Sequence, residues 1–108
     1  MANTFKLKTK ANVGITTQNV YVVPSATTTV IIGITLANTS GAGCIVGVGV
    51  TRPSSDDVNL LKNAPIPQGS SLEFMAGNKV VLEAADTLTV NSDTNGSIDV
   101  SLTIMETT

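Results

Sequence analysis

The chain has 108 residues, a formal net charge of −2, 16 Thr and 13 Val, one Cys, and no His or Trp. Because β-branched side chains favour strands, this composition predicts an all-β protein, and the length leaves room for one domain only. The lack of His argues against general-base catalysis and metal binding, and six cations against eight carboxylates argue against nucleic-acid binding.

The first predicted strand is short and alternates apolar with basic side chains: Phe5, Lys6, Leu7, Lys8 and Lys10. We interpret the lysines as the solvent face of this strand. Asn12 and Gly14 break the alternation, so residues 1–12 are predicted to form an N-terminal arm or an edge strand. The opening residues hold no basic region followed by an apolar run, and no later stretch is long enough to cross a bilayer. We therefore expect neither a signal peptide nor a membrane span.

Period-two alternation continues through eight further segments: residues 15–23, 28–38, 44–51, 58–61, 71–75, 79–83, 87–91 and 98–105. Turn residues separate them at intervals of roughly 8 to 12 residues, and no segment has helical periodicity. The pattern predicts a single antiparallel β-sandwich of about eight or nine strands over residues 1–108, and jelly-roll connectivity is compatible with it. We expect the chain to change sheets at residues 52–58 and at the Pro-Ile-Pro link, residues 65–67.

The alternation also predicts which side chains share a face. In segment 28–38 one face holds Val30, Ile32, Ile34 and Leu36, and in segment 44–51 the inward face holds Cys44, Val46, Val48 and Val50. Gly47 and Gly49 lie on the opposite face, which predicts either close approach of another backbone or a bend. Phe5, Tyr21 and Phe74 are the only aromatic residues, so the core is thin and we expect oligomerisation or docking to add stability.

Turn signals include a glycine at position 69 with an expected positive φ, a hairpin at residues 76–78, and Asn95-Gly96, the strongest two-residue hairpin signal. Around Gly96, oxygen-bearing side chains of residues 91–99 resemble the start of a calcium-binding loop. The position that should hold a bidentate Glu is Leu102, and no helix is predicted beside the loop. We therefore predict a solvated Asn-Gly hairpin there and no metal site.

The remaining candidates for chemistry have equally simple structural explanations. Several carboxylates are interpreted as surface turn charges: Asp56, Asp57, Glu83, Asp86 and Asp99. Cys44 is predicted to be a small buried hydrophobe, and the serine pairs 54–55 and 70–71 have no base partner. The glycine-rich segment 41–49 lacks the Lys-Ser/Thr pair of a phosphate loop. We predict no catalytic, cofactor-binding or metal-ligating residues, no cofactor and no enzymatic activity.

Two longer segments carry a resemblance beyond composition. Residues 20–38, VYVVPSATTTVIIGITLAN, resemble the "VYTVPSGTTAVVLGLTLANT" start of small virion structural proteins of tailed bacteriophages. Residues 64–73 and 77–86 are similar to the "PIPAGSSLE" and "GNKIVLEAGD" patterns of the same group. One departure is Ala85, where that pattern has Gly. If the turn requires a positive φ, either the Ala costs stability or the turn changes type.

The resemblance implies a non-enzymatic structural protein of the bacteriophage virion, made in the host cytoplasm. The role that we favour is to decorate or cement the capsid shell. A neck, collar, baseplate or tail-fibre component is the alternative. A carbohydrate-binding module at the host surface is less favoured, because the chain has few aromatic platforms. The expected partners are other copies of the chain, as a trimer or a dimer, and the major capsid protein or neck and tail proteins. Neither nucleic acid nor membrane is an expected partner.

Overall fold

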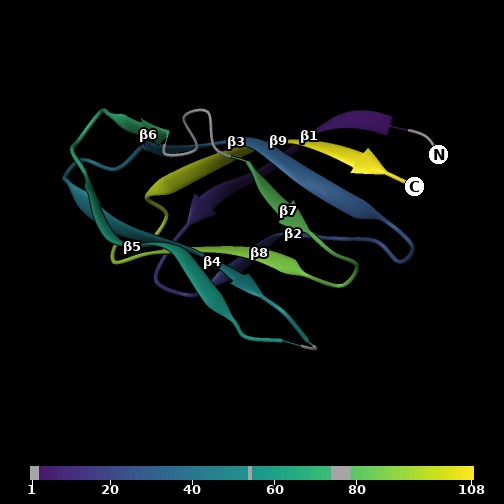
Figure 1. Ribbon diagram of the computed structural model, residues 1–108. Coiled ribbons are helices and arrows are strands. Elements are labelled where there is room, and N and C mark those ends of the chain that lie inside the picture. The colour runs from purple at the N-terminus through teal and green to yellow at the C-terminus, as the bar shows by residue number, and fades with distance from the viewer. Residues whose placement is uncertain (1–2, 54, 74–78) are drawn as a thin grey trace.

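Two antiparallel sheets make up the protein, whose computed structural model describes residues 3–53, 55–73 and 79–108 (Figure 1). Over these residues there are nine strands: β1 (Asn3–Val13), β2 (Gln18–Val22), β3 (Thr28–Asn38), β4 (Cys44–Thr51), β5 (Val58–Ile66), β6 (Ser71–Glu73), β7 (Val80–Leu82), β8 (Thr87–Ser92) and β9 (Ile98–Thr107). The prediction of an all-β sandwich is confirmed.

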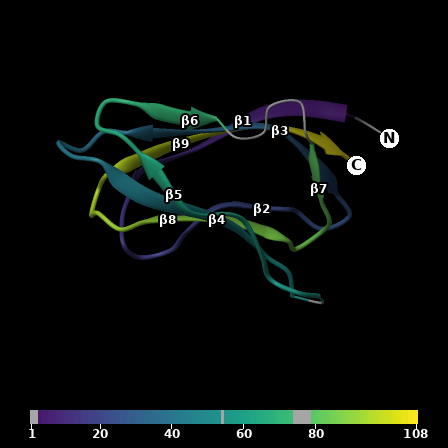
Figure 2. The same ribbon diagram turned by 60° about the vertical axis from the view of Figure 1, so that its left-hand side comes forward.

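The strand order identifies the connectivity as a jelly roll. Sheet A has the order β1-β9-β3-β6, with β7 also paired to β3, and sheet B has the order β2-β8-β4-β5. Since β6 and β7 share one position beside β3, the two sheets hold four strand positions each, joined by a chain that repeatedly crosses between them. Figure 2 shows the two layers, with β1, β3, β6 and β9 above and β2, β4, β5 and β8 below.

Two of the predicted connections differ from the structure. Residues 52–58 join β4 to β5, which are neighbours in sheet B, so the chain does not change sheets there. The Asn95-Gly96 turn, predicted to be a hairpin, has a positive φ at Gly96, but it joins β8 in sheet B to β9 in sheet A and is not a hairpin turn. Both signals are local, whereas the sheet to which a strand belongs depends on partners far away in the sequence.

The link after β5 does change sheets as predicted, although it is shorter than expected. Strand β5 includes Pro65 and Ile66, and the crossing to sheet A begins only at Pro67. Pro65 is tolerated because β5 is an edge strand, so its missing amide needs no partner. Gly69 has the expected positive φ of 71°. The hairpin predicted at residues 76–78 lies outside the described residues.

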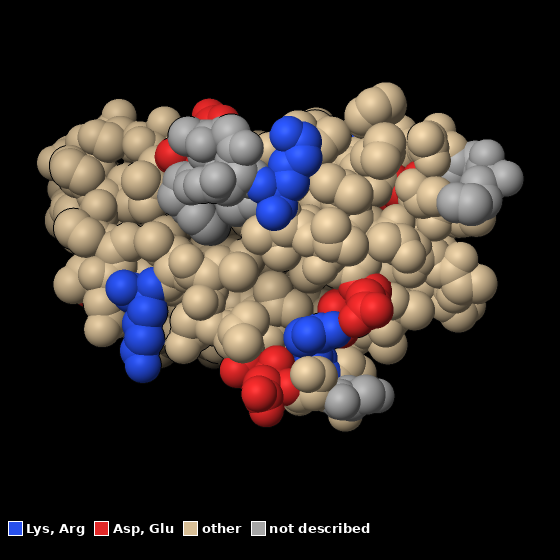
Figure 3. Space-filling model, viewed as in Figure 1, with Lys and Arg blue, Asp and Glu red and all other residues tan. Residues whose placement is uncertain are grey.

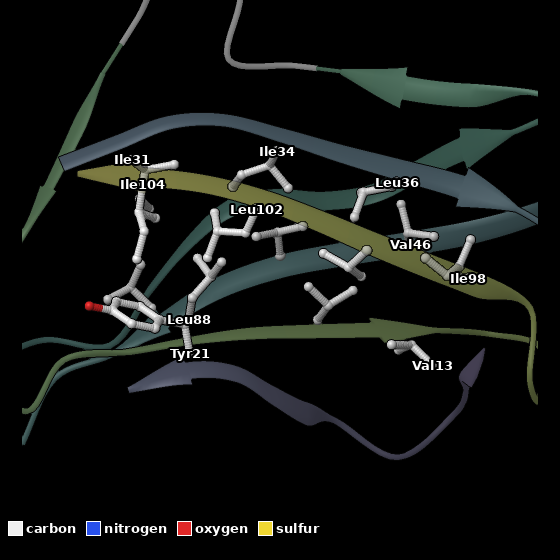
Figure 4. Packing of buried hydrophobic residues seen from close by; sticks show 14 of the residues in the cluster. Val13, Tyr21, Ile31, Ile34, Leu36, Val46, Leu88, Ile98, Leu102 and Ile104 are labelled. Atoms are coloured by element: carbon white, nitrogen blue, oxygen red, sulfur yellow. The ribbon is translucent and has the colours of Figure 1, made fainter. Parts of the chain in front are cut away.

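The core consists of aliphatic side chains from the inward faces of both sheets (Figure 4). Cys44, Val46, Val48 and Val50 of β4 are buried as predicted, and Tyr21 contributes the one aromatic ring of the buried cluster among the described residues. Strand β3 departs from its predicted face: Ile31, Ile34 and Leu36 are buried, whereas Val30 and Ile32 lie on the outer side. A β-bulge between Ile31 and Gly33 inserts one extra residue and reverses the alternation.

The N-terminal segment is the edge strand β1, paired with β9 from Asn3 to Val13. The break predicted at Asn12 is a register shift within this strand, where Asn12 has a φ of 58°. The face assignment of β1 was wrong. Three lysines lie opposite buried residues of β9: Lys6, Lys8 and Lys10. Phe5 and Leu7 lie on the outer face, where they are 70% and 65% exposed. The lysines tolerate the inward side because an edge lets their ammonium groups reach water.

The molecule is elongated, with extents of 45 × 25 × 21 Å and an exposed surface of 5771 Å². Asn3 and Thr107 lie opposite each other in the β1–β9 pair, so the two ends of the chain meet at one end of sheet A (Figure 1). The part of the chain that the structure describes includes no helix long and apolar enough to cross a membrane.

Candidate functional site

In the loop that resembles a calcium-binding site, the carboxylates of Asp93 and Asp99 accept hydrogen bonds from backbone amides. Asp93 Oδ1 accepts the amide of Ile45 at 3.0 Å and the Thr94 hydroxyl at 3.0 Å, and these bonds hold the pKa of Asp93 below its ordinary value. Asp99 Oδ1 accepts the amide of Asn12 at 3.0 Å. The two carboxylates therefore fasten the loop and β9 to different strands. Within residues 3–53, 55–73 and 79–108, no three His, Cys, Asp or Glu side chains are grouped so as to hold a metal ion.

A second group of acidic side chains surrounds Arg52, which follows the last residue of β4. The Arg52 guanidinium donates to Asp86 at 3.2 and 3.3 Å and to Glu83, and the Arg52 amide donates to Asp57 at 2.8 Å. Asp86 is buried and also accepts the amide of Glu83 at 2.9 Å. Figure 3 shows charged side chains gathered at this margin of the molecule.

The prediction that Asp86 is a surface charge is wrong, because Asp86 is buried and forms an ion pair with Arg52. It lines an open hollow of about 660 Å³ together with Thr27 and Pro53. The single positive charge of Arg52 is shared between the two carboxylates, and none of the described residues that line the hollow is His, Cys or Tyr. The arrangement therefore clamps the β4–β5 and β7–β8 connections to each other.

A buried polar cluster that sequence analysis missed joins three strands of sheet A to Tyr21 of sheet B. The Tyr21 hydroxyl bonds to Glu106 on β9 and lies 2.8 Å from Thr29 Oγ1 on β3. Glu106 Oε1 pairs with Lys6 Nζ on β1 at 2.8 Å. The ammonium of Lys8 lies 5.9 Å from the centroid of the Tyr21 ring. One carboxylate thus connects the edge strand to the core.

The environment of this cluster shifts two titrations in opposite directions. The hydrogen bonds from Lys6 and Tyr21 hold the pKa of Glu106 below its ordinary value. Burial, together with the hydrogen bond to Glu106, raises the pKa of Tyr21 to about 12. Both groups therefore keep one protonation state over the physiological range, in which the phenol donates to the carboxylate. That arrangement stabilises the fold and does not provide a proton-transfer group poised near neutral pH.

The remaining candidates occupy structural positions. Cys44 is buried on the inward face of β4, as predicted. Ser70 donates its amide to Pro67, and its carbonyl accepts the amide of Asn38, so this serine forms part of a turn. Ser55 lies in the exposed β4–β5 loop, and Ser54 lies outside the described residues. Over the described part of the chain, every buried side-chain nitrogen and oxygen has a hydrogen-bond partner.

The two glycines of β4 accommodate neighbours within the same chain. A Cβ at Gly47 would lie 2.7 Å from Asn91 Oδ1, and a Cβ at Gly49 would lie 3.1 Å from the carbonyl oxygen of Val58. The prediction of close backbone approach is therefore correct at Gly49, where β5 supplies the backbone. At Gly47 the approaching group is a side chain. Neighbours within sheet B therefore account for both glycines.

Comparisons with known proteins support the fold alone. No protein-family model matches the chain, and no curated protein matches it. Among solved structures, it is similar to a chain described in "Bacillus endospore appendages form a novel family of disulfide-linked pili". The TM-score is 0.59 at 13% sequence identity, and the match covers 99% of this chain and 87% of that one. An identity this low is evidence of a shared architecture only.

Proposed function

We propose that this chain is a non-enzymatic structural protein that works in many copies as part of a larger particle. The observation that carries the proposal is where the large apolar side chains lie. Phe5, Leu7 and Val81 are more than half exposed, while the core contains only one aromatic ring among the described residues. A chain with so few large side chains gains stability if those on the surface are covered in an assembly.

The particle favoured by the resemblance in residues 20–38, 64–73 and 77–86 is a bacteriophage virion, in which the protein decorates or cements the capsid shell. Two further features support a structural role. Jelly rolls are common in capsid proteins, and the acidic clusters around Arg52 and Glu106 are closed by internal partners. The same properties would suit a structural component of the neck, collar, baseplate or tail fibre, which is the alternative within the virion.

A surface appendage is a second candidate, because the fold is similar to that of a chain reported with disulfide-linked pili. Disulfide linkage does not transfer to this chain. A disulfide-linked polymer needs at least two cysteines in each subunit, whereas this chain has a single buried cysteine, Cys44. An appendage built from this protein would rely on non-covalent contacts between subunits.

The test is to locate and count the protein in purified particles by quantitative mass spectrometry and immunogold electron microscopy. A capsid-decoration role predicts labelling over the shell and a copy number that scales with the shell lattice. Labelling at one vertex or along the tail, with a few copies in each particle, would favour the neck or tail alternative. Labelling along filaments would favour the appendage. Recovery only as a free monomer, absent from every particle, would contradict the proposal.

A further inference from the structure

The outer face of sheet A carries few charges. Strand register places the outward side chains in cross-strand rows, which run as follows from the end where the termini meet: Asn3, Thr107 and Thr28; Phe5, Met105, Val30 and Val81; Leu7, Thr103 and Gly33; Thr9, Ser101, Thr35 and Glu73; Asp99, Ala37 and Ser71. Among these residues only Glu73 and Asp99 are charged. Both lie towards the end of the face away from Phe5.

One of these rows is apolar across the full width of the sheet. Phe5, Met105, Val30 and Val81 are contributed by β1, β9, β3 and β7 in turn. Its two outermost members, Phe5 and Val81, are 70% and 59% exposed, and Leu7 in the next row is 65% exposed. An aromatic residue, a methionine and aliphatic residues without charge are the composition found at the centre of protein–protein interfaces.

The other positions of the face suit a second copy of the same face. They are mainly Thr and Ser, whose hydroxyls both donate and accept hydrogen bonds and can therefore pair with identical groups. The lysines of β1 lie on the opposite side of the strand, facing the interior and its margin, so they do not meet each other across such a contact. A face rich in one kind of charge would repel its own copy, whereas the two carboxylates of this face lie towards one end of it.

The dimensions of the face are sufficient for a stable contact. Three full strand positions about 4.8 Å apart, with the 11 residues of β3 rising about 3.3 Å each, give roughly 500 Å². The three residues of β6 and the three of β7 in the fourth position add roughly 100 Å². The sum is near the lower end of the range for standard interfaces. A standard interface buries about 800 Å² on each partner. We propose that a second copy of this chain docks on the outer face of sheet A, face to face. This inference rests on the proposed function, because it names the surface through which the copies assemble.

Pairing through the open edge of β1 is a less favourable way to join two copies. An antiparallel pair of β1 strands centred on Leu7 would place Lys6 of one copy opposite Lys8 of the other. Like charges directly opposite each other destabilise a strand pair. The edge lysines therefore discourage edge-to-edge pairing and leave the outer face of sheet A as the better surface.

The inference is tested with two double variants that change no charge and keep β-forming residues. Phe5→Thr with Leu7→Thr removes apolar side chains from the outer face of sheet A. Val22→Thr with Ile45→Thr is the matched control, because these residues are 51% and 44% exposed on the outer face of sheet B. Sedimentation velocity over a concentration series measures self-association, and far-ultraviolet circular dichroism checks the fold.

We expect the sheet A variant to self-associate at least 100-fold more weakly than the wild type, and the control to differ from it by less than about threefold. A further variant, Thr103→Glu, places a charge in the middle of the face and should have the same effect without removing any apolar group. Weakening by the control alone would overturn the inference and leave self-assembly intact. A wild type that stays monomeric would also overturn it, while counting in particles still decides the proposed function.

Discussion

At the scale of single residues, two alanines occupy a backbone conformation that favours glycine. Ala26 and Ala85 have φ values of 54° and 71°. A left-handed conformation costs an L-residue roughly 1–2 kcal/mol, which a Cβ-free residue avoids. Ala85 lies in the turn between β7 and β8, where its amide donates to the Val23 carbonyl at 3.0 Å. The turn keeps this hydrogen bond in spite of the strain.

We therefore expect Ala85→Gly to increase the free energy of unfolding by about 0.5–1 kcal/mol, because relief of strain exceeds the added entropy of the unfolded chain. Ala84→Gly is the matched control: Ala84 is also exposed, and its φ is not positive. It should lower the free energy by about 0.4–1 kcal/mol. Urea denaturation of the three proteins measures both changes. If the two variants are destabilised alike, the strain at Ala85 is not real.

The titration of Tyr21 provides a second prediction, since it is the only tyrosine of the chain. Its pKa is raised to about 12 from the ordinary value of 10.0. A group whose pKa is raised by folding contributes stability that is complete below the unfolded pKa and is lost as the pH rises through the folded pKa. Stability should therefore fall between about pH 10 and pH 12.

Absorbance at the tyrosinate band measures this directly. The folded protein should titrate about two pH units above the urea-unfolded protein. Glu106→Gln removes the negative charge beside the hydroxyl and should bring the folded pKa closer to 10, although burial keeps it raised. A folded protein that titrates together with the unfolded chain would show that the phenol is not buried beside Glu106.

At the scale of elements, much of the strand pattern was readable from alternation. The predicted segment 28–38 coincides with β3, and alternation within β9 puts the buried residues Ile98 to Ile104 on one face. The bulge in β3 was not readable, because residues 30–32 are all β-branched and apolar. Either phase of the alternation then places apolar side chains in the core, so the position of the extra residue depends on pairing with β9.

The buried cluster was predictable in part. Continuing the inward face of β9 by two residues leads to Glu106, so its burial follows from alternation. Its partners do not follow, since Lys6 and Tyr21 are distant in sequence and meet it only through the strand order of the jelly roll. The faces of β1 were not predictable from alternation either, because an edge strand with inward lysines has the same period as one with outward lysines. Only the pairing with β9 decides which face turns inward.

The bulge leads to a prediction that separates two isoleucines of the same strand. Ile34 is fully buried, whereas Ile32 lies partly exposed on the outer side. Ile34→Ala should cost about 2–5 kcal/mol of unfolding free energy, and Ile32→Ala about 1 kcal/mol or less. Simple alternation without a bulge would make the two costs similar. Chemical denaturation of both variants distinguishes these patterns.

At the scale of the whole molecule, the most important question is whether β1 is an independent arm. It is one of four strand positions in sheet A, and it supplies both Lys6 for the buried Glu106 and the exposed Phe5 and Leu7. The same strand therefore contributes to the stability of the monomer and to the face proposed for assembly. Release of β1 as an arm would leave β9 with an open edge along most of its length.

Deletion of residues 1–10 tests this point. We expect the truncated chain to lose its cooperative unfolding transition or to aggregate, because the deletion removes the strand paired with β9 and the partner of a buried carboxylate. A peptide of residues 1–13, added in excess, should restore the spectrum of the native protein by filling the vacant edge. The readout is the amide nuclear magnetic resonance spectrum of the labelled truncated chain. If that spectrum keeps its native dispersion without the peptide, β1 is dispensable for folding and free to act as an arm.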